Sequence, residues 1–278
     1  MQQATVGKTV TYTGIGLHSG RNVTITLKPA SSNTGVIFAR TDLPGAPQVA
    51  AIAGNVTNTM RATTLESGQA KVFTVEHLLA AFYAMGVDNC LVEIDSVEPP
   101  VADGSSLPFV RLIEEAGITQ QEALRKVVYV KEAQTIRVDD KFITILPYDG
   151  LRITFTSINS HPMLGVQFGD YEITKDIFIR EIAPARTIGF MNEVALLQAQ
   201  GLALGGSLEN VVVYDEEKVL TPLRFADELV RHKILDIIGD LALTGHIKGH
   251  IIAVKSSHAI NTALAKKIVE HCEQNGNN

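Results

Sequence analysis

The sequence has few cysteines and no long apolar run. Cys90 and Cys272 are the only cysteines among 278 residues, so no disulfide framework can form. No apolar stretch approaches the roughly 18 residues that cross a membrane, and the first residues, MQQATVGKTVTYTG, lack the apolar core of a signal peptide. We therefore expect a cytoplasmic protein with no integral membrane segment.

Basic residues are outnumbered as well. The chain has 24 lysines and arginines against 30 aspartates and glutamates, and its formal net charge is −6. No basic run could neutralise a row of phosphates, so we expect no nucleic-acid partner, although a local basic pocket remains open. Apolar residues are abundant at 45% of the chain, and a chain of this length is expected to form two domains.

The apolar patterns occur twice in the same order. The first half has three alternating segments, a helix from Val75 to Gly86, a buried strand and a second helix that ends at Gly117; the strands are TVTYTG, NVTITLKPA, GVIFAR and NCLVEI. The second half has strands VVYV, ITILP and LRITFTSI, a helix within residues 225–243, the strand GHIIAVKS and a helix from about 259 to 273. Thr74 is expected to cap the first of these helices.

This repetition predicts an α+β fold with two domains of similar topology, each a β-sheet layered with α-helices. We place the domains at residues 1–124 and 125–278, with TQQEALRK as the linker. The second half also has an extra segment at about 191–214, an apolar helix, a Gly205-Gly206 break and a strand. Such an insert either thickens a core or walls a pocket for an apolar ligand.

The helix at 225–243 carries polar residues four apart. Glu228, His232, Asp236 and Asp240 share one helical face, opposite an apolar side. The ordinary interpretation is a solvated face, and Glu228 is expected to be solvated or structural. However, His232 and Asp236 lie one turn apart, which is a spacing at which two side chains can bind one metal ion.

Three other histidines have unusual positions. His77 lies in the first turn of a helix after Glu76, and a carboxylate beside a ligand can serve as general base, although glutamate is also favoured there for its charge. His258 lies where a strand ends and a helix begins, which suits either a reactive group or a capping residue. His18, in a glycine-rich turn, could be structural or functional. The others are expected to be structural: His161, His246, His250 and His271.

Together, His77, His232 and Asp236 would leave a fourth position open for water, as one catalytic zinc ion per chain requires. Glu76 could then act as base. His258, as a cation held by Asp240, could protonate a leaving amine. The active site would lie at the domain interface, with Glu76 and His77 from one half and the remaining groups from the other.

Two alternatives remain at this stage. Two histidines and an aspartate also form the facial triad of iron oxygenases, since a mixed nitrogen and oxygen site accepts iron. The other alternative is a non-catalytic binding protein, whose charged helix face is a surface or a partner interface.

Longer motifs resemble a known family over nearly the whole chain. The motifs are similar to the successive signature blocks of UDP-3-O-acyl-N-acetylglucosamine deacetylase, a zinc-dependent enzyme of lipid A (lipopolysaccharide) biosynthesis: TGIGLHSG, NTGVIFARTDLP, TVEHLLAA, VADGSSLPFV, ARTIGFMNEV, LGGSLENVVV, LRFADELVRHKILDIIGDL and KSSHAIN. The resemblance implies a metal-dependent amidohydrolase that releases acetate from an acylated UDP-amino-sugar.

The resemblance also implies a role for each site residue. It implies His77, His232 and Asp236 as zinc ligands, with Glu76 as general base. It further implies His258 as acid, Asp240 as its support and the Thr187 hydroxyl as a donor to the oxyanion. The insert at 191–214 would form a passage for the acyl chain, and a monomer is expected. Substrate contacts are expected from Lys233, Lys255, Leu17, His18, Met60, Thr63 and Phe190.

Overall fold

Two sheets built on the same plan form the two ends of the molecule. The computed structural model describes residues 1–274. The first sheet has the order β2-β3-β9-β4-β5, with bounds Val10–Ile15, Asn22–Pro29, Cys90–Ile94, Val36–Arg40 and Gln48–Ala50. The second has the order β12-β13-β18-β14-β15, with bounds Gln134–Val138, Lys141–Leu146, His246–Val254, Leu151–Ile158 and Val166–Glu172.

The strand directions also match. The strand that comes last in the sequence of each sheet, β9 or β18, lies in the middle of that sheet. It is antiparallel to one neighbour and parallel to the other. The outer pairs are antiparallel in both sheets. Strands such as β3 and β14 alternate buried and partly exposed residues, because helices cover only one face. The predicted α+β fold with repeated topology is confirmed.

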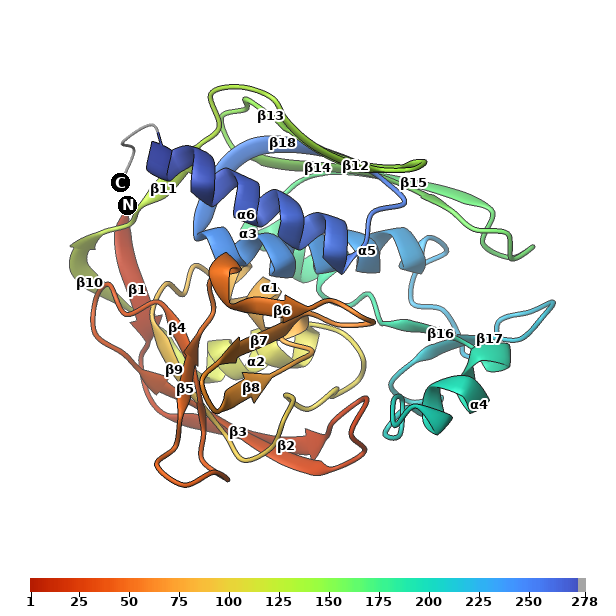
Figure 1. Cartoon of the computed structure of the whole chain (residues 1–278), viewed down its shortest axis with the longest axis horizontal. Helices are drawn as coiled ribbons and strands as arrows, with labels where there is room; N and C mark the ends of the chain where they lie inside the picture. The colour runs from red at the N-terminus through yellow and green to blue at the C-terminus, as the bar shows by residue number, and fades with distance from the viewer. Residues whose placement is uncertain (275–278) are drawn as a thin grey trace.

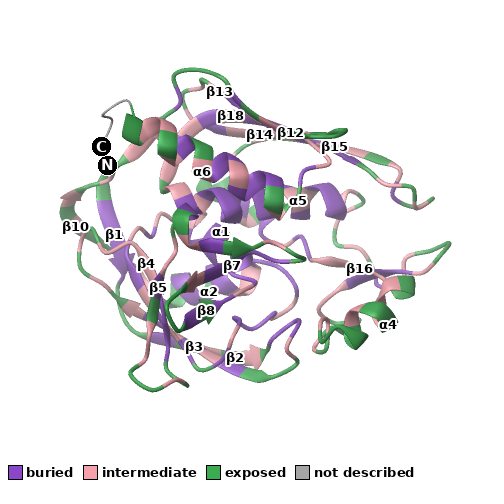
Figure 2. Ribbon diagram, in the orientation of Figure 1, coloured by how far each residue is buried: buried purple, intermediate pink, exposed green. Residues whose placement is uncertain are grey.

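Helices fill the space between the sheets. They are α1 (Glu76–Met85) and α2 (Leu107–Ala116) in the first half, and α5 (Glu228–Leu241) and α6 (His258–Gln274) in the second. Figure 1 shows the second sheet at the top, α6 and α5 beneath it, then α1 and α2, and the first sheet at the bottom. Figure 2 shows that α1 and most of α5 are buried, so the core continues from one half to the other.

The ends of α1 bear out one prediction and contradict another. Gly86 ends the helix in the left-handed conformation, at φ 75°, as predicted. Thr74 is not the N-cap, because Val75 holds that position without a side-chain hydrogen bond. The Thr74 hydroxyl instead donates to the buried carboxylate of Glu98 at 3.0 Å, and its backbone has a φ of 55°.

The predicted linker is largely a strand. Most of TQQEALRK belongs to β10 (Ile118–Leu124), which pairs antiparallel with β1 (Gln2–Val6). Next along the chain, β11 (Val127–Tyr129) pairs with β18. The polar residues of β10 are not typical of a strand, because one side of this two-stranded ribbon faces solvent. Its partner strand β1 lies at the start of the chain, so no local pattern indicates the pairing.

Smaller elements complete the chain. They are η1 (Ala53–Asn55), β6 (Val56–Asn58), β7 (Thr64–Ser67), β8 (Ala70–Val72), α3 (Lys175–Ile177), the π-helical turn η2 (Phe178–Ile182) and η3 (Ala242–Thr244). In residues 1–274 no helix combines the length and the apolar character needed to cross a membrane.

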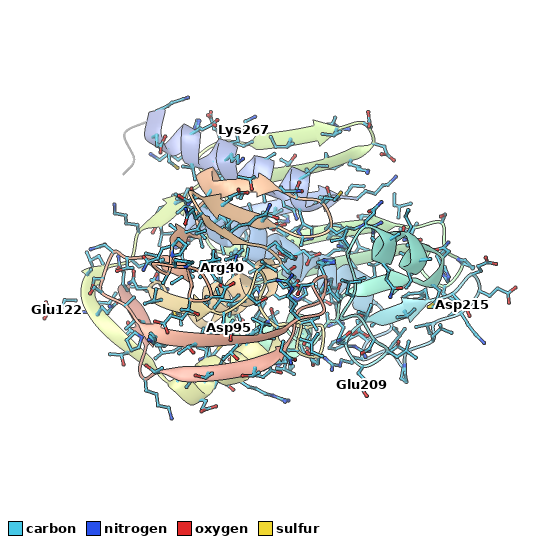
Figure 3. The ribbon with its side chains drawn as sticks, turned by 60° about the horizontal axis from the view of Figure 1, so that its bottom comes forward. Arg40, Asp95, Glu122, Glu209, Asp215 and Lys267 are labelled. Carbon is cyan, nitrogen blue, oxygen red and sulfur yellow. The ribbon has the colours of Figure 1, made fainter. Side chains whose placement is uncertain are left out.

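The insert projects from one side of the molecule. It follows β16 (Ile188–Phe190) and contains α4 (Met191–Ala199) and β17 (Val212–Tyr214). In Figure 3, Glu209 of this segment and Asp215 directly after it lie on one side of the molecule, away from Arg40 and Asp95 of the first half. No residue of α4 is buried, so this helix adds nothing to the core.

Candidate metal and acid–base site

The site lies where α1 meets α5, and a glycine makes the close contact possible. A Cβ atom at Gly239 would lie 2.0 Å from the Glu76 carbonyl oxygen, so only glycine lets the two backbones approach this far. The first turn of α1, which carries Glu76 and His77, therefore presses against the polar face of α5. That face is buried, with Asp236 2% and Asp240 0% exposed, and is not the solvated surface of the ordinary interpretation.

Three side chains of this contact could hold a metal ion. One ligand atom from each of His77, His232 and Asp236 lies within 4.8 Å of the others, and within residues 1–274 no other group of this kind is found. The Asp236 Oδ1 is 3.4 Å from the His232 Nε2 and 3.8 Å from the His77 Nε2. The two imidazole rings are nearly perpendicular, with centroids 5.0 Å apart. The structure thus brings together the predicted ligand set.

The protonation of these groups suits a cation. The His232 Nδ1 lies 3.1 Å from the Ala185 carbonyl, which can only accept, so Nδ1 is the donor and Nε2 keeps its lone pair. Burial, and then the neighbouring His232, lower the pKa of His77 to about 3, and burial lowers the pKa of His232. Burial alone would raise the pKa of Asp236, but Lys233 and the surrounding histidines hold it well below its usual range.

One atom of this cluster lacks a partner. The Asp236 Oδ2 accepts a hydrogen bond from the Lys233 Nζ at 2.7 Å, whereas Oδ1 is buried and has no hydrogen-bond partner among the described residues. A buried carboxylate oxygen that faces two imidazole nitrogens without a hydrogen bond is unfavourable by itself, and a divalent cation would satisfy all three atoms. The residues therefore fit a metal ion.

An acid–base pair adjoins the cluster. The His258 Nδ1 is 2.9 Å from the Asp240 Oδ2, and the His258 Nε2 is 3.8 Å from the Glu76 Oε1. Burial alone would lower the pKa of His258, but the carboxylates of Asp240 and Glu76 raise it to about 10. Burial raises the pKa of Glu76 to about 7, against the lowering effect of His258. At neutral pH the site therefore holds an imidazolium beside a carboxyl whose pKa is raised by burial.

The remaining predicted residues lie around this centre in different ways. Lys233 is on α5 and its ammonium reaches the cluster through Asp236. Thr187 follows two residues after Ala185, whose carbonyl holds His232, and its own backbone is bonded to Gly104 and Val212. Thr63 is fully buried and bonds both Glu76 and Asp240.

Other predicted substrate contacts lie at the insert or outside the cluster. The backbone of Leu17 and His18 bonds the insert at Gly205 and Leu204, at 3.0 and 3.1 Å. The Phe190 ring lies at a tilt beside the rings of His161 and Tyr214, with centroids 6.0 Å apart in each pair. Met60 is 64% exposed, and Lys255 forms an ion pair with Asp140. In the part of the chain that the structure describes, no hydrogen bond or ion pair joins Met60, Phe190 or Lys255 to the metal cluster.

Sequence reasoning missed a buried ion pair that supports the site. Glu228 is 1% exposed, its Oε1 accepts from the Arg186 Nε at 2.8 Å, and it also accepts from the backbone N–H groups of Arg186 and Arg224. The pair fixes the segment that carries Ala185 and Thr187. No pattern indicates it, since its partners lie 42 residues apart. Glu228 is thus structural and not solvated.

Asn261 was missed too. Its amide donates to the Asp240 Oδ2 at 2.9 Å, beside the bond from His258. The signal was available, because residues 258 and 261 lie three apart at the start of α6 and so share a helical face.

A separate cavity of about 940 Å³ is lined in part by Leu79, Phe82 and His246, and no residue of the metal cluster lines it.

Comparisons with known proteins identify a family that matches nearly the whole chain. The family model described as UDP-3-O-acyl N-acetylglycosamine deacetylase matches residues 3–270. The UDP-3-O-acyl-N-acetylglucosamine deacetylase of Citrifermentans bemidjiense is 46% identical over 271 residues, which cover 96% of this chain and 89% of that protein. Proteins of the same name from Anaeromyxobacter sp. and Haemophilus influenzae are 47% and 43% identical, over 96% and 98% of this chain and 88% and 92% of their own. The resemblance is confirmed, and the chain belongs to the UDP-3-O-acyl N-acetylglycosamine deacetylase family.

Proposed function

We propose that this protein removes the N-acetyl group from UDP-3-O-acyl-N-acetylglucosamine, giving UDP-3-O-acyl-glucosamine and acetate in lipid A biosynthesis. The observation that carries the proposal is the buried meeting of His77, His232 and Asp236 with Glu76 and His258 at one helix crossing. The names of the curated relatives supply the substrate. Nothing in the site favours the oxygenase or the binding-protein alternative.

His77, His232 and Asp236 would hold one divalent ion, and we propose zinc. Such an ion polarises the acetyl carbonyl and lowers the pKa of water when it is bound. Lys233 holds the far oxygen of Asp236 and so keeps the other oxygen directed at the two histidines.

The proton transfers belong to Glu76 and His258. The Glu76 Oε1 takes a proton from the attacking water, whose oxygen forms the new bond to the acetyl carbon. The His258 Nε2 gives its proton to the sugar nitrogen as the carbon–nitrogen bond breaks, and Asp240 holds the opposite ring nitrogen. The 3.8 Å between the Glu76 Oε1 and the His258 Nε2 supports the assignment of base and acid to adjacent sides of the reacting group. We assign the Thr187 hydroxyl to the oxyanion.

The insert at 191–214 is our proposed acyl-chain passage. Its support is the large exposure of apolar side chains that a folded chain would normally bury: Leu196 of α4 is 62% exposed, and Leu204 and Leu208 of the loop that follows are 50% and 54% exposed. We propose that Leu17, His18, Met60 and Phe190 line the route from the insert to the site. Lys233 and Lys255 would meet the polar part of the substrate.

We also propose the division into domains 1–124 and 125–278. Its support is that β10 pairs with β1, whereas β11 pairs with β18 of the second sheet. The site would then be complete only when both domains are docked within one chain, which agrees with a monomer. A cytoplasmic location is proposed from the two free cysteines.

The decisive experiment measures acetate release from the acylated UDP-amino-sugar before and after chelation, together with the metal content. We expect release to stop when the metal is removed and to return with added zinc. Glu76→Gln should keep the metal and lose about 10²- to 10⁴-fold in kcat, as removal of a general base does. Acetate release that survives complete metal removal would overturn the proposed function.

A further inference from the structure

Thr63 contacts both carboxylates of the acid–base pair. It lies in the loop before β7, and its side chain is 0% exposed. Its backbone N–H donates to the Glu76 Oε2 at 3.1 Å, and its hydroxyl donates to the Asp240 Oδ1 at 2.5 Å. One residue of the loop thus joins the start of α1 to the last turn of α5.

These bonds fix the rotation of each carboxylate. The Asp240 Oδ2 accepts from His258 and Asn261, whereas the Asp240 Oδ1 accepts from the Thr63 hydroxyl. Asp240 is fully buried, so no bulk water can replace a lost donor. With Oδ1 held, Oδ2 stays directed at the His258 Nδ1. In the same way, a bond to the Glu76 Oε2 leaves Oε1 facing the His258 Nε2.

Threonine suits this task better than a flexible donor. Its branched Cβ restricts χ1, so the direction of its hydroxyl is set once the backbone is fixed. The backbone is fixed because Thr64, the next residue, pairs with Asn58 at the edge of the β6-β7 ladder. The hydroxyl is therefore preorganised toward Asp240 at little entropic cost.

We propose that Thr63 is a positioning residue of the deacetylation: it holds the outer oxygens of Glu76 and Asp240 and so sets the separation between base and acid. This inference rests on the proposed function and assigns Thr63 a role different from the substrate contact that the family resemblance implies. It acts through its neighbours, so it should affect turnover and leave substrate binding intact.

The test compares Thr63→Val, which keeps the shape and removes the hydroxyl, with Thr63→Ser, which restores the donor. Thr63→Val should lose about 10- to 100-fold in kcat, the size expected for a lost hydrogen bond to a charged group, with KM and metal content unchanged. Thr63→Ser should stay within about 3-fold of the parent protein. Thr64→Val is the matched control, because in the described chain its hydroxyl bonds neither carboxylate, and it should leave kcat unchanged.

A second measurement does not depend on turnover. The His258 Nδ1 proton that bonds Asp240 should give a downfield proton resonance, and this resonance should shift in Thr63→Val but not in Thr64→Val. Thr63→Ala replaces Thr63→Val in both measurements if the valine variant does not fold.

The outcomes separate this inference from the proposed function. A parental kcat in Thr63→Val, a raised KM with unchanged kcat, or an unmoved resonance would each overturn the positioning role while Glu76→Gln remains inactive. If the parent protein itself releases no acetate, the proposed function fails, and the resonance still decides whether Thr63 orients the pair.

Discussion

The two halves of the molecule share one plan but contribute different chemistry at the same helix positions. Aligned on their Val-x-His sequences, α1 carries His77 where α5 carries His232. One turn further, α1 has Ala81 and α5 has Asp236, and all four are buried. The repeated fold therefore brings two equivalent helices into contact, while the proposed ligand set is asymmetric, with one donor from the first half and two from the second.

The asymmetry extends to the acid–base groups. Met85 of α1 stands where α5 has Asp240, and Glu76 stands where α5 has Arg231. Arg231 points to the outer side of its helix, where it pairs with Asp227 and Glu181 at 2.7 Å. Buried carboxylates need partners. Asp236 and Asp240 are bonded by Lys233 and His258 of their own half, and Thr63 of the first half bonds Asp240 across the interface. The difference teaches that the same topology provides the packing in both halves, while the residue types at a few positions on the facing helices provide the site.

The largest effect should come from removing the single ligand of the first half. His77→Ala leaves both second-half ligands in place, yet we expect more than about 100-fold weaker metal binding, beyond the loss typical for supporting partners, and no detectable acetate release. Metal content after dialysis measures this. His250→Ala, which removes a histidine bonded to Thr154 on the second sheet, is the control and should retain the metal. Retention of metal by His77→Ala would show that α5 binds it alone.

Much of this comparison could be predicted from the sequence. Alternating strands, the four-residue spacing on α5 and the glycine at the end of α1 each depend on neighbours in sequence, so local patterns reveal them. The same pattern gave His232, Asp236 and Asp240 one common face. The longer motifs added the roles that remain proposals, such as that of Thr187.

Local sequence patterns could not predict which polar side chains are buried or which distant segments pair with each other. The polar face of α5 predicts exposure to solvent, but the close contact with α1 at Gly239 and the contacts with α6 bury it. The pairing of β10 with β1 and the bond from Thr74 to Glu98 join segments that are far apart or have ordinary compositions. Such contacts depend on the assembled core, where tertiary packing overrides local propensity.

A smaller effect should follow from removing the charge of Asp240, which supports the proposed acid His258. His258 must be protonated to act, and Asp240 helps to raise its pKa to about 10, so activity is lost as the pH rises through that value. Asp240→Asn should lower this pKa and move the alkaline limb of kcat/KM to lower pH, with about 10- to 100-fold lower kcat/KM at pH 9. Glu76, with a pKa of about 7, must be ionised, so activity is lost as the pH falls below it.

The counterpart in the first half provides the control for that pH profile. Met85→Leu changes the equivalent position of α1 with conserved volume, and both limbs should stay in place. An alkaline limb that is unmoved in Asp240→Asn would show that Asp240 does not support the imidazolium.

The smallest effect concerns the contact that joins the halves. In an ordinary helix interior, replacing glycine with alanine stabilises by about 0.5–1 kcal/mol. At Gly239 the new Cβ would lie 2.0 Å from the Glu76 carbonyl oxygen, so the helices must separate, and overpacking of this kind costs about 1–3 kcal/mol. Gly239→Ala should therefore lower the free energy of unfolding by about 1–2 kcal/mol.

Denaturant unfolding measures whether Gly239→Ala lowers or raises the free energy of unfolding. A substitution at the equivalent position of α1, residue 84, provides the comparison. Residue 84 is already alanine, so Ala84→Gly should destabilise by about 0.5–1 kcal/mol, as it does in any helix that is not crossed closely. If Gly239→Ala instead stabilised the protein, the helices would not be in backbone contact at Glu76. Because the base is carried on the contacted turn, a loss of stability in Gly239→Ala should be accompanied by slower acetate release, whereas Ala84→Gly should leave turnover unchanged.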